Sequence, residues 1–144
     1  MLLAGLPGSG KSTWVANKKG VLSSDALREL LADDPENQNI HARVFRVLRS
    51  LLKHRLELKR PVTYVDATNL TPRERRPYIK LAELLDAEIE AIFFDVPVTE
   101  CIRRNRGRAR VVPGEAIQKM ADKLVAPDLS EGFSKVSRPP MLQE

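Results

Sequence analysis

The fold is decided by the stretch GLPGSGKS at residues 5–12, which fits the pattern G-x-x-x-x-G-K-[S/T]. Its glycines let the backbone curl so that N–H groups point inward at oxygen atoms. In this pattern the lysine reaches the β- and γ-phosphates of a nucleoside triphosphate, and the next hydroxyl can bind Mg²⁺. The stretch therefore predicts a site for ATP, or another nucleoside triphosphate, with Mg²⁺. The residues expected to hold the nucleotide are Gly8, Ser9, Gly10, Lys11, Ser12 and Thr13.

Apolar strands and amphipathic helices alternate along the chain around this loop. Strands are predicted at 1–5, 20–24, 61–67, 87–97 and 134–136. Helices are predicted at 10–18, 25–32, 41–58, 71–85, 98–106 and 113–125, with a polar loop at 33–39. This alternation predicts an α/β three-layer sandwich, in which a parallel sheet of four to five strands carries helices on both faces. The glycine loop then lies at the carboxyl edge of the sheet, where such folds bind ligands.

Length and composition favour a single domain over residues 1–144. The net charge of +5 fits anionic partners such as nucleotides or nucleic acid, although many soluble proteins are mildly basic. We expect no membrane span, no signal peptide and a flexible tail at 137–144. The lone Cys101 excludes an internal disulfide and suits a reducing cytoplasm, and we interpret it as a small buried hydrophobe.

The predicted helix at 41–58 is amphipathic. Its apolar positions are Val44, Phe45, Leu48, Leu51, Leu52 and Leu56, and its basic positions on another face are Arg46, Arg49 and Lys53. The basic face either guides a phosphate backbone or is simply solvated. The helix after the third strand begins with TPRE at 71–74, which predicts a capping box between Thr71 and Glu74.

Phosphoryl transfer to an alcohol needs a carboxylate that accepts the hydroxyl proton and positive charge around the transferred group. Asp25 follows the strand at 20–24, so it lies at the same sheet edge as the glycine loop. It is either the general base or the N-cap of the next helix, and the two uses are compatible. Arg28 lies one turn further on the same helix face, where it either grips an acceptor phosphate or pairs with Glu29 or Asp25 on the surface.

Two further groups complete the predicted site. Asp66 ends the apolar strand at 61–67, where it holds Mg²⁺ through water, buttresses the loop or caps a turn. The segment RRNRGRAR at 103–110 holds five arginines and no lysine, which favours multidentate phosphate contacts over a solvated basic run. We expect a short arginine-rich lid at about 104–113 that closes on the phosphates. The arginines available to it are Arg104, Arg106, Arg108 and Arg110.

Five stretches that together cover nearly the whole chain resemble one known family. They are GLPGSGKSTW (5–14), SSDALR (23–28), VDATNLTPRERR (65–76), FFDVPVTECIRRN (93–105) and RGRARVVPGEAIQKM (106–120). In this order they look like the kinase domain of bacteriophage and bacterial polynucleotide 5′-kinases, within the broader P-loop kinases that phosphorylate hydroxyls. The resemblance implies a P-loop kinase-like fold, ATP and Mg²⁺, and transfer of the γ-phosphate to the 5′-hydroxyl of a nucleic-acid end, as in repair or end healing.

The resemblance also implies roles for single residues. Lys11 matches the family's phosphate lysine, and Ser12 matches its Mg²⁺-binding serine. Asp25 matches the general base that activates the 5′-hydroxyl, and Arg28 matches the arginine that binds the acceptor's 3′-side phosphate.

The lid and the metal site follow from the same resemblance. Arg108 is the best match for the lid arginine on the donor phosphates, and Arg104 is the second choice. Asp66 matches a residue near the phosphates, so the expected metal-binding pair is Ser12 and Asp66.

Two other functions fit the same residues. One is a P-loop kinase for a small hydroxyl compound, such as a nucleoside, a sugar derivative or a toxin-type substrate, whose binding depends little on salt. A nucleic-acid acceptor would instead bind more weakly as salt rises. The other is a non-catalytic ATP-binding module, against which the intact Lys11, Ser12 and Asp25 argue. The sequence leaves open the oligomeric state and the choice between RNA and DNA.

Overall fold

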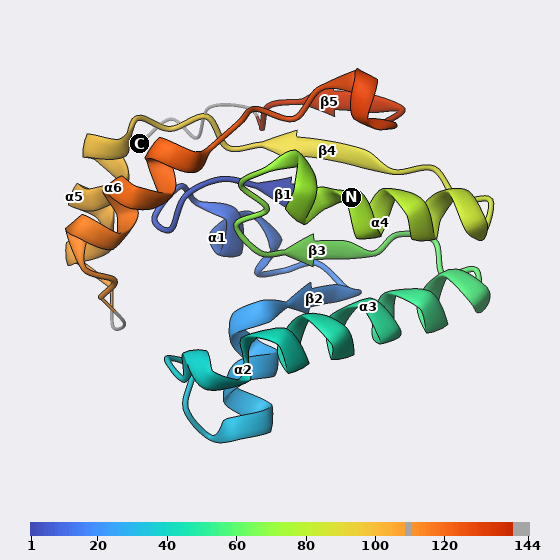
Figure 1. Cartoon of the computed structure of the whole chain (residues 1–144), viewed down its shortest axis with the longest axis horizontal. Helices are drawn as coiled ribbons and strands as arrows, with labels where there is room; N and C mark the ends of the chain where they lie inside the picture. The colour runs from blue at the N-terminus through green and yellow to red at the C-terminus, as the bar shows by residue number, and fades with distance from the viewer. Residues whose placement is uncertain (109–110, 140–144) are drawn as a thin grey trace.

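The computed structural model describes residues 1–108 and 111–139 and contains a five-stranded parallel sheet in the order β2-β3-β1-β4-β5 (Figure 1). The strands are β1 (Leu2–Ala4), β2 (Val21–Ser23), β3 (Tyr64–Asp66), β4 (Glu90–Phe93) and β5 (Lys135–Ser137). β1 lies at the centre, where Leu3 pairs with Asp66 of β3 on one side and with Ile92 of β4 on the other. The predicted parallel α/β sheet is confirmed, and its first four strands are shorter than expected.

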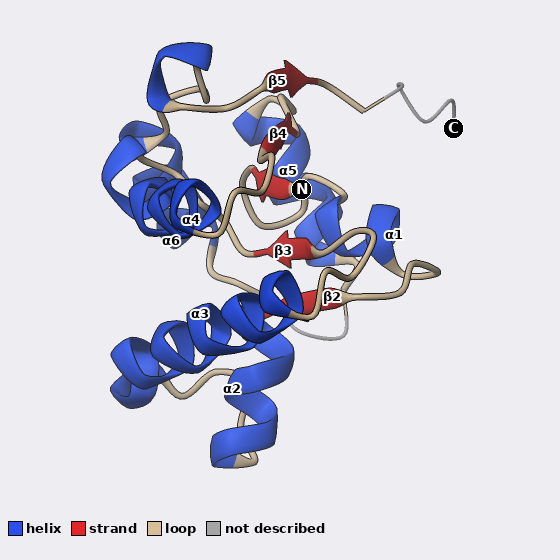
Figure 2. Cartoon of the chain, turned by 90° about the vertical axis from the view of Figure 1, so that its right-hand side faces the viewer, coloured by secondary structure: helices blue, strands red, loops and turns tan. Residues whose placement is uncertain are grey.

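Helices cover both faces of this sheet. They are α1 (Lys11–Val15), α2 (Ser24–Ala32), α3 (His41–Glu57), α4 (Pro72–Leu84), α5 (Val98–Arg106) and α6 (Gly114–Lys123). Single 3₁₀ turns form at Gln38–Ile40, inside and just after the predicted loop, and at Leu129–Glu131. Figure 2 shows α3 and α4 on one side of the sheet and α1 on the other. Figure 1 shows α5 and α6 beyond the carboxyl ends of the strands.

The two faces of the sheet bury separate apolar clusters. Successive side chains of a strand point to opposite faces, so Leu2 packs with Leu48 of α3 and Tyr78 of α4, whereas Leu3 packs with Val15 of α1. Burial raises the pKa of the Tyr78 hydroxyl to about 12, so this core residue stays neutral at ordinary pH. Within the described residues, no helix is long and apolar enough to cross a membrane.

The apolar face of α3 is narrower than its sequence predicts. Val44, Leu48 and Leu52 are buried at a spacing of four residues, and Phe45 at their margin is half-buried. The prediction that Leu51 belongs to the buried face is wrong, because its side chain is 37% exposed. A helix that covers an edge of the sheet buries one stripe, and Leu51 lies about 100° around the helix from Leu52.

Strand β3 starts at Tyr64, three residues later than expected. The neighbouring strands begin at Leu2, opposite Val65, and at Val21, opposite Tyr64. Before this point the Arg55 guanidinium of α3 donates to the Val62 carbonyl at 3.0 Å and to the Thr63 hydroxyl at 2.9 Å. The Arg55 side chain therefore holds this segment against α3 just before the segment enters the sheet. β3 is nevertheless an interior strand, between β2 and β1, as its apolar sequence predicts.

Helix α4 begins with the predicted capping box. The Thr71 hydroxyl accepts a bond from the Glu74 N–H, and the Glu74 carboxylate accepts one from the Thr71 N–H. One carboxylate oxygen of Glu74 also accepts from the Leu70 N–H at 2.7 Å. Three backbone donors at the helix start are therefore satisfied locally.

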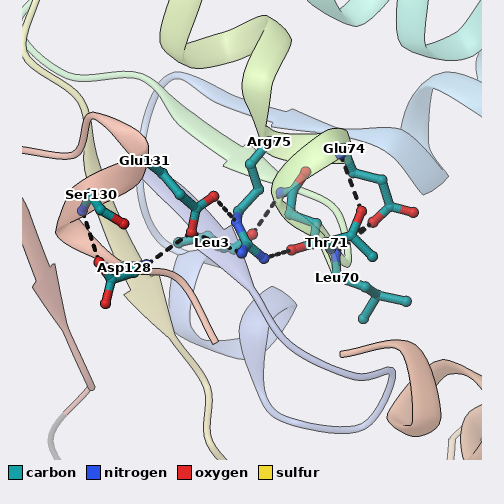
Figure 3. A network of polar contacts seen from close by, with 9 residues as sticks. Leu3, Leu70, Thr71, Glu74, Arg75, Asp128, Ser130 and Glu131 are labelled. Carbon is teal, nitrogen blue, oxygen red and sulfur yellow. Dashed lines mark hydrogen bonds and ion pairs between the residues drawn. The ribbon is translucent and has the colours of Figure 1, made fainter. Parts of the chain in front are cut away.

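Figure 3 shows how the next residue of α4, Arg75, ties distant segments together. Its guanidinium is completely buried and forms two bonds to the Glu131 carboxylate, at 2.9 and 3.0 Å. A third bond, of 2.8 Å, runs to the carbonyl of Asn69 in the turn that follows β3. Glu131 in turn accepts a bond from the Asp128 N–H. Arg75 therefore joins the carboxyl edge of the sheet to the segment before β5.

The last strand takes residues that were expected to lie in a flexible tail. Ser137 belongs to β5, and Arg138 pairs with Asp95 at 3.3 Å and lies over the Phe93 ring. The predicted tail at 137–144 therefore begins too early, because pairing with β4 extends to Ser137. Residues 140–144 lie outside the described part of the chain.

We predict that Arg75→Met lowers the free energy of unfolding by about 3 to 5 kcal/mol, because it leaves the Glu131 carboxylate, which is only 13% exposed, without its positive partner. Urea denaturation measures the change. The matched control is Arg76→Met, since Arg76 follows directly and is exposed. It should change stability by less than about 0.5 kcal/mol. Equal destabilisation by the two variants would show that the buried pair is unimportant.

Candidate active site

The glycine loop connects β1 to α1 at the carboxyl edge of the sheet. Gly8 and Gly10 have φ values of +84° and +99°, a region that residues with a side chain rarely adopt. A Cβ atom on Gly8 would lie 2.5 Å from the carbonyl oxygen of Cys101 in α5, whereas one on Gly10 would meet only Arg104 at 4.0 Å. Gly8 therefore allows the loop to pack directly against the backbone of α5.

Helix α1 is shorter than predicted and ends at Val15. Its first internal hydrogen bond runs from the Trp14 N–H to the Gly10 carbonyl. The backbone N–H groups before Trp14 therefore have no hydrogen-bond partner within the helix. At the other end the Ala16 N–H bonds to Thr13, a three-residue spacing that closes the last turn. The loop and this single short helix present backbone donors at the sheet edge.

Lys11 is folded back over the glycine loop. Its ammonium donates to the carbonyls of Gly5 and Leu6, at 2.9 Å each, and approaches the hydroxyl of buried Ser9 at 3.5 Å. Burial lowers the pKa of Lys11 to about 8, an effect that the nearby Asp66 carboxylate opposes. The loop thus holds a buried cation with carbonyl partners and one nearby acid.

Asp66 lies directly beside Ser12. The Ser12 hydroxyl donates to the Asp66 carboxylate at 3.0 Å, and Asp66 is itself buried. Burial raises the pKa of Asp66, while the Lys11 ammonium and the bond from Ser12 oppose the rise. A hydroxyl and a carboxylate side by side are oxygen donors of the kind that Mg²⁺ prefers. The described residues contain no group of three or more acidic, histidine or cysteine side chains suited to a metal ion.

A cavity of about 480 Å³ brings the predicted residues together. Of the predicted residues, Gly8, Gly10, Lys11, Ser12, Thr13, Asp25, Arg28, Asp66, Arg104 and Arg108 line it. Ser9 is buried, and its N–H donates to the Leu6 carbonyl at 3.1 Å. The loop, the start of α2, the end of β3 and the end of α5 therefore converge on one space, as expected from parallel strands.

Asp25 and Arg28 form an ion pair in the wall of this cavity, at 3.1 Å between Oδ1 and NH1. Ser23, rather than Asp25, is the N-cap of α2, because its hydroxyl accepts the Ala26 N–H. The Asp25 side chain is half-exposed, but Arg28 is only 4% exposed. The alternative that Arg28 pairs on the surface with Glu29 or Asp25 is therefore wrong about its location, although the pairing with Asp25 is present.

The predicted lid starts on a helix rather than on a loop. α5 continues to Arg106, and Arg104 in its last turn binds Glu100 at 3.0 Å. The Glu100 carboxylate also pairs with Arg103, and its bonds to the two arginines lower its pKa to about 2. Arg104, Arg106 and Arg108 are all exposed, and of these three Arg104 and Arg108 line the cavity.

A side chain that the sequence reasoning missed lies at the start of the predicted lid segment. Asn105 is buried, and its amide bonds to both the N–H and the carbonyl of Val112. These two bonds join the end of α5 to the segment before α6 and define where the loop begins and ends. Arg110 lies outside the described residues.

Three further cavity residues were also missed: Gln38, His41 and Phe45, from the 3₁₀ turn and the first turns of α3. The sequence placed Phe45 on the apolar face of this helix and gave His41 no role. A useful signal was present, because α3 packs antiparallel to the strands and so begins at their carboxyl edge (Figure 1). Cys101 is fully buried and free, as predicted for a small hydrophobe.

Comparison with known proteins agrees with this arrangement. A family model described as AAA domain (AAA_33) matches residues 1–127. The L-seryl-tRNA(Sec) kinase of Methanococcus maripaludis is 30% identical over 137 residues, which are 88% of this chain and 52% of that protein. The chain therefore spans about half the length of this curated relative.

Two solved structures share the fold. One is described as the structure of the Pnkp1/Rnl/Hen1 complex, with a TM-score of 0.61 and 24% identity over 78% of this chain and 39% of that chain. The other is the Mycobacterium tuberculosis APS kinase CysC in complex with AMPPNP and APS, with a TM-score of 0.55 and 21% identity over 96% and 87% of the two chains. Together with the family match over most of its length, the fold and the site show that this chain belongs to the AAA domain family, with a P-loop kinase-like α/β fold.

Proposed function

We propose that the protein transfers the γ-phosphate of ATP to the 5′-hydroxyl of a nucleic-acid end. The observation that carries this proposal is the Asp25–Arg28 pair, which opens into the same cavity as the glycine loop. The loop supplies the donor side. A carboxylate with an adjacent buried arginine supplies what a phosphate-bearing alcohol needs on the acceptor side.

On the donor side, Lys11 and the N–H groups of Ser12 and Thr13 bind the phosphates of the nucleotide. Ser12 and Asp66 hold Mg²⁺, which when bound neutralises charge on the β- and γ-phosphates. A bound triphosphate supplies negative charge close to Lys11, which favours its protonated form despite burial. Lys11 then exchanges its carbonyl partners in the loop for phosphate oxygens.

On the acceptor side, Asp25 accepts the proton of the attacking hydroxyl. Arg28 binds the phosphate on the 3′ side of the same nucleotide, which places the 5′-hydroxyl beside Asp25. Arg104 and Arg108 stabilise the charge that spreads over the transferred group. The resemblance of SSDALR and the lid segment to polynucleotide 5′-kinases supports these roles, as does the net charge of +5.

A second acceptor is favoured by the curated relative. The name L-seryl-tRNA(Sec) kinase denotes a seryl acceptor attached to tRNA, and 88% of this chain aligns with that protein. Transfer to such a group uses the same donor site and the same base. A seryl acceptor differs from a nucleic-acid 5′-end in the distance between the reacting hydroxyl and the nearest phosphate of the acceptor. In the proposal for a 5′-end, Arg28 binds this nearest phosphate.

One assay with labelled ATP and Mg²⁺ tests the proposal. The acceptors are a 5′-OH oligoribonucleotide, a 5′-OH oligodeoxyribonucleotide, a nucleoside 3′-monophosphate, seryl-tRNA and a set of small alcohols. Label on either oligonucleotide, with acceptor binding that weakens as salt rises, supports the proposed function. Label on seryl-tRNA alone or on small alcohols alone assigns the other acceptor, and no label on any of them argues for a non-catalytic module.

We predict that Asp25→Asn lowers the rate of transfer about 10²- to 10⁴-fold and leaves ATP affinity unchanged, because it removes the proton acceptor and weakens only the pairing with Arg28 on the acceptor side. Steady-state kinetics and ATP binding measure the two quantities. Glu29→Gln is the control, since Glu29 lies exposed on the same helix. Transfer by Asp25→Asn at the rate of the control would show that another group takes the proton.

The two glycines of the loop should respond differently to alanine. Gly8→Ala should lower stability more than Gly10→Ala, because its Cβ would meet the Cys101 carbonyl at 2.5 Å. Gly10→Ala should cost only the strain of its positive φ, about 1 to 2 kcal/mol. Both variants should show a smaller rise in Tm with ATP·Mg²⁺, since both alter the phosphate cradle. A normal rise for both would place the nucleotide elsewhere.

A further inference from the structure

Two aromatic rings stand side by side in the wall of the cavity. His41 and Phe45 lie one turn apart at the start of α3, with ring centroids 4.8 Å apart and planes at 50°. Both residues line the cavity. His41 is exposed, and Phe45 is half-buried with its inner side packed against the main core. One side of the cavity therefore offers an aromatic surface on a rigid helix.

These rings are next to the acceptor side of the site. The His41 Nδ1 atom lies 3.5 Å from NH2 of Arg28, whose NH1 binds Asp25. The Nε atom of Arg28 is buried and has no hydrogen-bond partner in the described part of the chain. A buried guanidinium with an unsatisfied donor is a costly arrangement that a further acceptor oxygen would relieve. The aromatic surface thus adjoins a group suited to an anion.

We infer that His41 and Phe45 form the surface on which the base of the acceptor nucleotide stacks. This rests on the proposed function and specifies its acceptor as a unit that carries a base as well as a phosphate. The phosphate meets Arg28, the 5′-hydroxyl meets Asp25, and the base meets the two rings. Stacking on an aromatic side chain tolerates any base, because every base has a π face. The site therefore selects nucleotides over alcohols that lack an aromatic base, and it accepts any base sequence.

The donor base is the competing occupant, and the arrangement of elements argues against it. The rings come from α3, which contacts the helix that carries Asp25 and Arg28. Arg104 and Arg108, which face the donor phosphates in the proposed mechanism, come from α5 and the segment that follows it. The rings and the acceptor pair therefore belong to one wall of the cavity, and the lid belongs to another.

The test compares two acceptors that differ only in the base. Both have a 5′-hydroxyl, a 3′-phosphate and a deoxy sugar: 2′-deoxyadenosine 3′-monophosphate, and the tetrahydrofuran analogue of an abasic deoxynucleoside 3′-phosphate. We expect wild-type protein to prefer the first in kcat/KM. Phe45→Leu should reduce this preference roughly tenfold while activity on the abasic acceptor stays the same. Phe45→Tyr, which keeps the ring, should retain the preference.

A binding measurement and a control variant make the result specific. Fluorescence of 2-aminopurine riboside 3′-phosphate should be quenched on binding to wild-type protein and much less on binding to Phe45→Leu. Leu56→Ala is the matched control, because Leu56 is half-buried on the same helix, packs against the same core and lies away from this cavity. It should lower stability and leave both the preference and the quenching unchanged.

The possible outcomes separate this inference from the proposed function. An unchanged preference and unchanged quenching in Phe45→Leu overturn the stacking site and leave the kinase activity standing. A loss of ATP affinity with an unchanged acceptor preference assigns the rings to the donor base and also overturns the inference. If wild-type protein labels no acceptor, the proposed function fails, while a quenching signal that depends on Phe45 still supports a base-binding surface.

Discussion

The site depends on the bonds that tie the turn after β3 to the start of the glycine loop. The side-chain amide of Asn69 donates at 2.6 Å to the carbonyl of Leu3, which belongs to the central strand β1. The Gly5 N–H, where the glycine loop begins, donates to the Thr68 carbonyl at 3.0 Å. Asn69 adopts a positive φ of 46°, a conformation that asparagine tolerates better than most residues. The loop is thereby fixed in position relative to Asp66, the last residue of β3, before any ligand contributes.

Arg75 holds the same turn from the other side. It binds the Asn69 carbonyl, while its remaining donors bind Glu131 far along the chain. A buried ion pair of this kind adds little net stability compared with apolar packing. The bonds of Arg75 instead fix positions, because they join the turn after β3, α4 and the segment before β5 in one arrangement. In the proposed mechanism Asn69 and Arg75 therefore support the site by holding this turn, without contacting the nucleotide themselves.

The sequence predicted what depends on local pattern. The alternation of elements gave the parallel sheet with the glycine loop at its carboxyl edge, and the predicted capping box of Thr71 and Glu74 is present. The sequence-based predictions were wrong where a structural feature depends on residues that are distant in the sequence. The start of β3 depends on where its neighbours β1 and β2 begin, and the burial of Arg28 depends on how α2 and α3 pack. His41 joins the cavity only because α3 begins at the carboxyl edge, a fact of topology that no single segment contains.

The cavity contains two buried cations, Lys11 and Arg28, one on each side of the transferred group in the proposed mechanism. Removing a cation from water is unfavourable unless strong partners replace the water. Lys11 donates its hydrogen bonds to neutral carbonyls. Burial lowers its pKa to about 8, although the nearby Asp66 carboxylate opposes this lowering. Arg28 has one carboxylate on NH1 and an unsatisfied Nε. Each cation would therefore gain an additional partner from an anion with several oxygens, and this is the physical basis on which the proposed mechanism gives both the donor and the acceptor a phosphate.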